Sequence, residues 1–148
     1  MRNIIVFLPI LILAILESTI IPLHLVLLAI ICWSVLRPGR EGMLVAFFSG
    51  LILDFLEGKT LASSSILFLI TSFLIYLYKN RFQAGRFAFL LPFTLFSLIV
   101  VDLLDGLPAL SIRTVLIEGV NTVLIIFLFP IFNFLAKSFG EEQLKLKI

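Results

Sequence analysis

The chain has 148 residues, of which 61% are hydrophobic and 14% are charged, and its mean hydropathy is +1.24. Soluble domains carry about 25% charged residues, so this composition excludes a globule that covers itself with polar side chains in water. The single cysteine, Cys32, excludes an internal disulfide and a cysteine-based zinc cluster.

The first apolar run, residues 4–36, contains only Glu17 and His24 as ionisable side chains. As one helix it would be about 50 Å long, against a hydrocarbon core of about 30 Å, so we expect it to fold back. The break is expected between Glu17 and Pro22, where a charge, two hydroxyls and a proline coincide. This pattern predicts helices over residues 3–18 and 20–36.

Four more apolar segments follow, separated by short polar or glycine-containing turns. They predict helices over residues 41–56, 61–78, 87–104 and 113–136. The predicted fold class is therefore an all-α integral membrane protein with six transmembrane helices. No linker or low-complexity segment divides it, so residues 1–148 are expected to form one domain.

Lysine and arginine residues in short loops predict the orientation of such a protein. With both termini in the cytoplasm, the outer side would hold only Lys59 and Arg113. The inner side would hold the other basic residues, Arg2, Arg37, Arg40, Lys79, Arg81, Arg86, Lys137, Lys145 and Lys147. The opposite orientation would place all of these outside, so we predict cytoplasmic termini.

This orientation also sorts the acidic residues, which gather toward the outer face together with His24 and Arg113. They are Glu17, Asp54, Glu57, Asp102, Asp105 and Glu118.

Residues 48–58 are echoed by residues 96–106, with Phe, Ser, Asp, Leu, an acid and Gly in the same register. Both copies end helices that run outward, as does the first helix near Glu17, so we interpret the pattern as a parallel repetition of helical hairpins.

The helix predicted over residues 41–56 carries small residues at every fourth position, Gly42, Ala46 and Gly50, and Asp54 and Gly58 continue the register. Positions four apart lie on one helix face. A face without bulky side chains lets another helix approach closely in a membrane, so we predict that these five residues mediate helix packing or partner binding. Arg40 and Glu41 are expected at the inner rim.

No residue pattern indicates catalysis. His24 has no Gly-x-Ser-x-Gly motif near any serine, and Asp54 and Asp102 are better explained as polar groups at helix ends than as a pair of catalytic carboxylates. One histidine, one cysteine and scattered acids do not give the spacing of a metal site. Phosphate-binding glycine loops are absent, and the basic loops are the ordinary orientation signal. We therefore predict no enzyme, cofactor or metal, and no nucleic acid partner.

Several polar residues could line a pocket that opens outward. The alternative, hydrogen bonds between helices that hold the bundle together, is the interpretation that we favour. The pocket candidates are Glu57, Asp102, Glu118 and Asn121.

The segment around residues 37–70 resembles the MreD family of rod shape-determining membrane proteins. The resemblance rests on Arg40, Glu41 and Gly42, on Gly50 and Leu51, and on Asp54 and Gly58, in a small protein with six predicted helices. The family often has a Leu-Gly pair after the following turn, where this sequence has Leu61 and Ala62.

The resemblance implies a non-catalytic scaffold of side-wall elongation in the bacterial cytoplasmic membrane. Its implied partners are an MreC-like single-span protein, a RodA-type wall polymerase with its transpeptidase, an MreB-type filament protein and the lipid bilayer. It also implies a fold like the substrate-binding subunit of energy-coupling-factor vitamin transporters. That likeness supplies the alternative function, a solute-binding membrane subunit.

Overall fold

The computed structural model describes residues 2–20, 23–37, 39–58, 60–81, 87–104 and 111–145. In these ranges the regular secondary structure is entirely α-helical, and the predicted all-α fold with six helices is confirmed. The charged residues Lys59, Arg86 and Lys147, which entered the orientation argument, lie outside the described residues, as do Asp105 and Gly106 of the sequence echo. The helices are α1 (Arg2–Thr19), α2 (Leu25–Leu36), α3 (Arg40–Glu57), α4 (Ser63–Arg81), α5 (Phe87–Leu104) and α6 (Ile112–Lys145).

Two helices differ most from the bounds expected from the sequence, whereas α1, α3 and α4 agree to within three residues at each end and α5 has the expected bounds. Helix α2 begins at Leu25 rather than at residue 20. Pro22 disfavours helical geometry in the residue before it, which explains why the helix does not begin at residue 20. Helix α6 continues to Lys145 rather than ending at residue 136. The apolar stretch ends there, but a change from apolar to polar side chains does not by itself end a helix.

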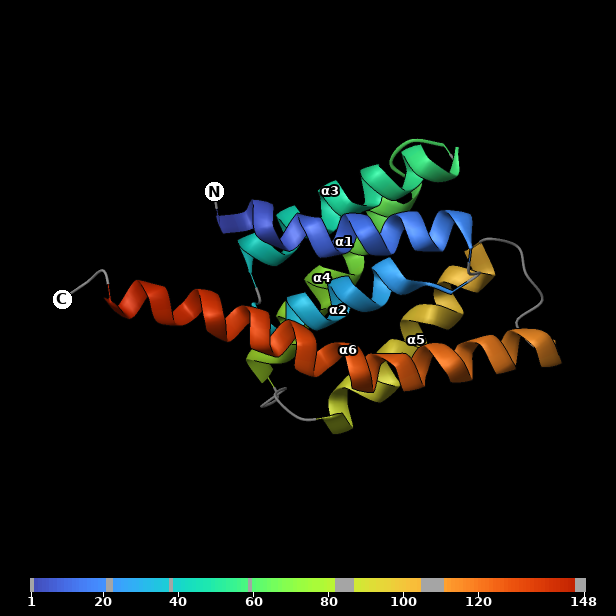
Figure 1. Cartoon of the computed structure of the whole chain (residues 1–148). Helices are drawn as coiled ribbons and strands as arrows, with labels where there is room; N and C mark the ends of the chain where they lie inside the picture. Colours follow the sequence, from blue (N-terminus) through green and yellow to red (C-terminus); the bar gives the residue numbers. More distant parts are fainter. Residues whose placement is uncertain are drawn as a thin grey trace.

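Helix α2 lies at the centre of the bundle, where it packs against α1, α3, α4 and α6 (Figure 1). Its residues from Leu25 to Val35 are all buried. A helix that is apolar on every side is expected to be surrounded by other helices. The side chains of α2 are apolar on all its faces, which fits its central position. Helix α3 packs most closely against α4, and α5 packs against α6.

The helix ends form two groups. One group contains the ends of α1, α3 and α5 and the starts of α2, α4 and α6, toward the right in Figure 1. We call it the acidic end, because Glu17, Asp54, Glu57, Asp102 and Glu118 lie in these parts of the helices. The start of α1 and the end of α6 both lie at the opposite end of the bundle (Figure 1).

The exposed surface is largely apolar and several ionisable side chains are buried, unlike in a typical water-soluble protein. Large apolar side chains are exposed along the outer faces of the helices, including Phe55, Phe73 and Phe127, whereas Asp54, Asp102 and Glu118 are buried. Such a distribution is expected in a membrane, where ionisable groups face the bundle interior. Among the described residues, Ile112–Ser138 is the one segment that is clearly long and apolar enough to cross a membrane, with a hydropathy of 2.3. Shorter apolar helices are Val6–Thr19, Leu25–Leu36, Ser63–Tyr78 and Leu90–Leu104.

Candidate functional site

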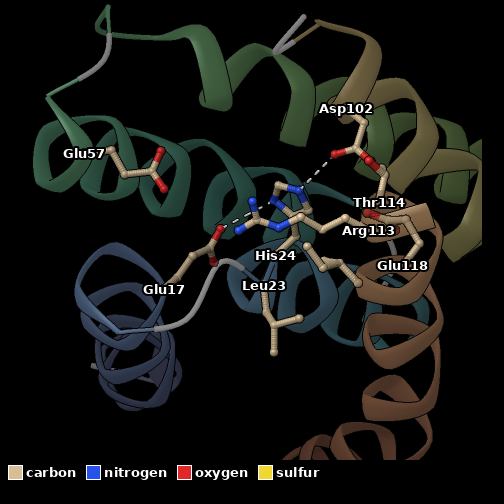
Figure 2. A pocket seen from close by; sticks show the side chains of 9 residues that line it. Glu17, Leu23, His24, Glu57, Asp102, Arg113, Thr114 and Glu118 are labelled. Atoms are coloured by element: carbon tan, nitrogen blue, oxygen red, sulfur yellow. Dashed lines mark hydrogen bonds and ion pairs between the residues drawn. The ribbon is translucent and has the colours of Figure 1, made fainter. Parts of the chain in front are cut away.

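A cavity of about 340 Å³ lies at the acidic end of the bundle (Figure 2). It is formed where the ends of α1, α3 and α5 meet the connection before α2 and the start of α6. Most of its lining side chains are ionisable, and a few apolar groups complete the wall. The lining residues are Glu17, Leu23, His24, Glu57, Asp102, Arg113, Thr114, Ile117 and Glu118.

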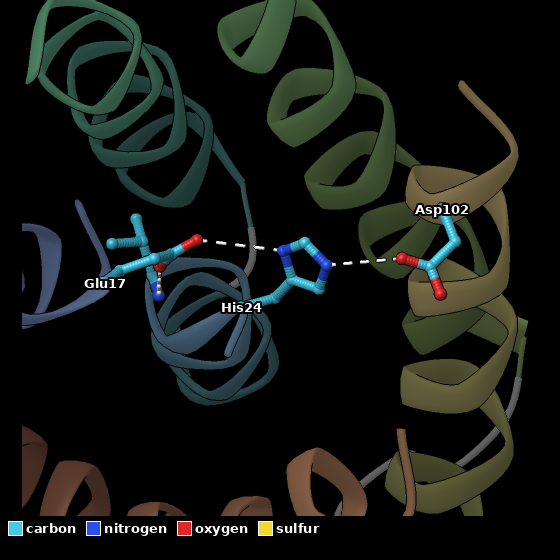
Figure 3. A network of polar contacts seen from close by, with 4 residues as sticks. Glu17, His24 and Asp102 are labelled. Atoms are coloured by element: carbon cyan, nitrogen blue, oxygen red, sulfur yellow. Dashed lines mark hydrogen bonds and ion pairs between the residues drawn. The ribbon is translucent and has the colours of Figure 1, made fainter. Parts of the chain in front are cut away.

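The His24 imidazole lies between two carboxylates of different helices (Figure 3). Its Nε2 atom is 3.4 Å from Oδ1 of Asp102, on α5, which is within hydrogen-bond distance. Its Nδ1 atom is 3.7 Å from Oε1 of Glu17, on α1, which is an ion-pair distance when the ring is protonated. His24 precedes α2 in the chain, so this ring links the end of α1 and the connection before α2 to α5, which is far away in sequence.

The surroundings of His24 favour its protonated form. Burial lowers the pKa of His24, but the contact with Glu17 and the negative charges of Glu17, Glu118 and Asp102 raise it by more. The pKa of His24 therefore lies above its ordinary value of 6.5. At pH 6.5 the ring is therefore mostly protonated, and its positive charge offsets the negative charges of the neighbouring carboxylates.

Glu17 has a second contact that fixes its position. Its Oε2 atom accepts a hydrogen bond from the backbone N–H of Val26, at 2.8 Å. Val26 is in the first turn of α2, where N–H groups have no partner within the helix, and the side chain of His24 does not cap that helix. Glu17 therefore caps α2 from the neighbouring helix, and its charge is favourable at a helix N-terminus.

Asp54 likewise caps the second helix of the next hairpin, α4. Both of its carboxylate oxygens lie 3.1 Å from the backbone N atom of Ser64, in the first turn of α4. In each of the first two hairpins, an acid near the end of the outgoing helix thus accepts a hydrogen bond from the start of the returning one. Asp102 occupies the matching position in the third hairpin, and its carboxylate contacts His24 instead.

Three of the four predicted pocket residues, Glu57, Asp102 and Glu118, line the cavity. Glu57 lies apart from the His24 group, on the α3 side (Figure 2). Asn121 is fully buried and is not among the lining residues. Asp102 and Asn121 flank the Glu118 carboxylate, but neither oxygen of Glu118 has a partner in hydrogen-bond geometry among the described residues.

The small-residue face of α3 lies inside the bundle, where Gly42, Ala46 and Gly50 are buried. A Cβ atom on Gly50 would lie 2.4 Å from Cα of Ser65, so α3 and α4 touch there through their backbones. A Cβ atom on Gly42 would lie 2.9 Å from the carbonyl oxygen of Arg37. These positions meet other helices of the same chain, and their role toward a partner stays a prediction.

The ends of α3 hold the remaining predicted residues. Gly58 follows the helix in the left-handed conformation, with φ of 64°, and its N–H group bonds to the carbonyl oxygen of Asp54. Gly58 is therefore a helix C-cap whose positive φ favours glycine, since nothing within 4 Å of a Cβ position requires one for space. At the other end Arg40 is exposed, and Glu41 lies 3.9 Å from the guanidinium of Arg37.

Glu17 and His24 are central to the site but were not predicted as site residues. Both carried a usable signal, because the orientation of the helices had already placed them at the same end as Asp102 and Glu118. No spacing in the sequence separates these four from the other outer polar residues, since they come from four separate elements that only the fold brings together.

The family comparison agrees with the resemblance seen in the sequence. The family described as rod shape-determining protein MreD matches residues 2–139, nearly the whole chain. No curated protein and no solved structure matches it. Six helices with exposed apolar faces and polar groups turned inward agree with a membrane protein of this kind. The chain therefore belongs to the MreD family of rod shape-determining membrane proteins.

Proposed function

We propose that the protein is a non-catalytic scaffold of the bacterial side-wall elongation machinery and crosses the cytoplasmic membrane six times. Family membership supports the role in rod shape. The observation that carries the scaffold proposal is the distribution of surface: the described residues are almost all in helices, and the outward faces of these helices are apolar. Contacts with other proteins are then made by helix faces within the bilayer.

The small-residue face of α3 supports this function indirectly. Because Gly42, Ala46 and Gly50 are buried against other helices of the chain, they hold α3 in place rather than offering a free surface. The outward face of α3, with Phe47, Phe48 and Phe55, remains exposed. A partner helix would dock on such exposed faces of a bundle that is held rigid from within.

The proposed direct partner is an MreC-like single-span membrane protein. A RodA-type wall polymerase, its transpeptidase and an MreB-type filament protein belong to the same proposed assembly, and lipid covers the faces that no partner occupies. No nucleic acid takes part in this proposal.

Site-specific photo-crosslinking tests the scaffold proposal. A photoreactive residue is placed at Phe55 on α3, Phe73 on α4 or Phe127 on α6, which are exposed positions on three different helices. Each variant is coexpressed with the MreC-like partner and irradiated in membranes. We expect crosslinks from one face and none from the others, and the same variants without the partner give the background.

The scaffold proposal fails if all three positions give only background while the proteins are inserted and the partner is present. A second measurement uses Gly50→Leu, which inserts a large side chain between α3 and α4. Copurification with the partner should fall, because the face that the partner binds depends on this packing. Unchanged copurification of a correctly inserted Gly50→Leu protein would contradict the proposed role of the α3 strip.

The cavity at the acidic end favours one alternative function, a solute-binding subunit of an energy-coupling-factor-type transporter. Its volume of about 340 Å³ suits a small molecule. This alternative predicts that a small molecule stays bound during purification and binds with saturable affinity. Native mass spectrometry of the purified protein separates the two functions, since the scaffold needs no bound organic ligand.

A further inference from the structure

Three side chains that suit a metal ion meet in the cavity at the acidic end: His24 before α2, Asp102 on α5 and Glu118 on α6 (Figure 2). Each offers one nitrogen or oxygen atom, and these atoms all lie within 4.8 Å of one another. We propose that they bind a divalent transition-metal ion of the zinc type. This inference does not depend on the scaffold proposal, which assigns no ligand to the cavity.

The two carboxylates in this group need a compensating cation or proton. Asp102 and Glu118 are only 3% and 7% exposed, respectively. Burying two carboxylates close together is costly unless a positive charge or a proton compensates. Neither oxygen of Glu118 has a hydrogen-bond partner among the described residues, and Glu118 lines the cavity. Glu118 therefore has both the charge and the free lone pairs of a ligand.

The remaining cations near the cavity do not satisfy Glu118. Arg113 lines the same cavity, but its side chain is exposed, and it forms no ion pair with Asp102 or Glu118 in the described part of the chain. A protonated His24 would place its charge between Glu17 and Asp102 (Figure 3). A divalent ion next to Nε2 would balance Asp102 and Glu118 together.

The orientation of the imidazole is the one that metal sites use. A histidine ligand usually directs its other ring N–H toward a carboxylate, which fixes the ring and its tautomer. Here Nδ1 of His24 faces Glu17, and Glu17 is itself held by the N–H of Val26. Nε2 is left facing Asp102 and Glu118.

The donor set determines the class of metal. One imidazole nitrogen and two carboxylate oxygens suit borderline ions such as Zn²⁺ or Co²⁺. Ligand atoms around tetrahedral zinc lie about 3.4 Å apart, which matches the 3.4 Å between His24 Nε2 and Asp102 Oδ1. Three protein ligands leave a fourth position open toward the cavity, where water would complete the coordination.

The test uses the full chain in detergent, without a histidine tag and stripped of metal with a chelator. Co²⁺ is titrated in as a spectroscopic probe, and Zn²⁺ is then added to compete. We expect saturable visible absorption from bound Co²⁺ that Zn²⁺ removes. Because His24 is the only histidine, NMR of the ¹⁵N-labelled imidazole observes this residue alone, and Zn²⁺ should shift its Nε2 signal.

Substitutions of the proposed ligands test whether the ion binds to these side chains. His24→Ala should abolish Co²⁺ binding, and Glu118→Gln should weaken it by about tenfold or more. The matched control is Glu57→Gln, which removes an acid of the same cavity outside the ligand group, and it should bind Co²⁺ like the unmodified chain. No saturable binding together with an unmoved His24 signal would overturn the site, as would equal loss in Glu57→Gln and Glu118→Gln. If the Glu118 variant does not fold, the NMR result on the unmodified chain decides.

Discussion

Replacing Gly50 with alanine tests the close approach of α3 and α4 with a single added methyl group. The new Cβ atom would lie 2.4 Å from Cα, 2.5 Å from N and 2.8 Å from Oγ of Ser65. Ordinary carbon contacts are about 3.5–4.0 Å, so the two backbones would have to separate by about 1 Å. Two of the three contacted atoms belong to the backbone of α4 and cannot rotate away, so the strain spreads along the helix pair.

Overpacking of this kind costs about 1–3 kcal/mol. For chains near this size, each kcal/mol lowers Tm by about 2–4 °C, so we expect a fall of roughly 2–12 °C. The assay is thermal unfolding in detergent, followed by circular dichroism or by the fluorescence of Trp33, the only tryptophan.

Gly119→Ala is the matched control, because Gly119 lies in α6 with nothing within 4 Å of a Cβ atom. Alanine in a helix there should leave Tm unchanged or raise it, since it is the better helix former by about 1 kcal/mol. If Gly50→Ala melts with or above Gly119→Ala, the helices are not in backbone contact at Gly50, and the reasoning is wrong.

Two further predictions concern the acidic end. Asp54→Ala removes the acceptor for the N–H of Ser64 and should lower the stability by about 0.5–2 kcal/mol, as for other helix caps. Asp54→Asn, which keeps one oxygen, should recover part of the lost Tm. Equal Tm values for Asp54→Ala and the unmodified chain would contradict the cap. The pKa of His24 is raised above 6.5, so its stabilising contribution is fully present below pH 6.5 and is lost as the pH rises through the folded-state pKa. The groups around it are Glu17, Glu57, Asp102, Arg113 and Glu118. In chelator-treated protein, His24→Gln should therefore flatten the fall of Tm as the pH rises above 6.5, and an unchanged slope would show that other groups cause it.

The sequence was sufficient to predict the six helices and the end of the bundle at which the acids gather. Both inferences rest on local patterns: long apolar runs between charged turns, and basic residues concentrated in alternate loops. The spacing of Gly42, Ala46 and Gly50 predicted a helix face for close packing, and the structure places these residues inside the bundle. Their spacing could not show which helix they meet, since that depends on the tertiary arrangement.

The partners of His24 were beyond sequence reasoning for the same reason. Glu17, Asp102 and Glu118 are brought to it by α1, α5 and α6, and no regular spacing connects them. The start of α2 was also mispredicted by residue pattern alone. Residues 20–24 are mostly apolar and continue the hydrophobic run, but the helix begins only at Leu25, where Glu17 caps its first turn.

The caps made by Glu17 and Asp54 have a consequence for the order in which the chain enters a membrane. A carboxylate buried in hydrocarbon without a partner is costly, and Asp54 is synthesised before Ser64, which supplies its hydrogen bond. Glu17 likewise precedes Val26. In each case the partner arrives on the very next helix, so a pair of helices is the smallest segment in which the acid is satisfied. For the six-span topology proposed above, this arrangement favours insertion two helices at a time.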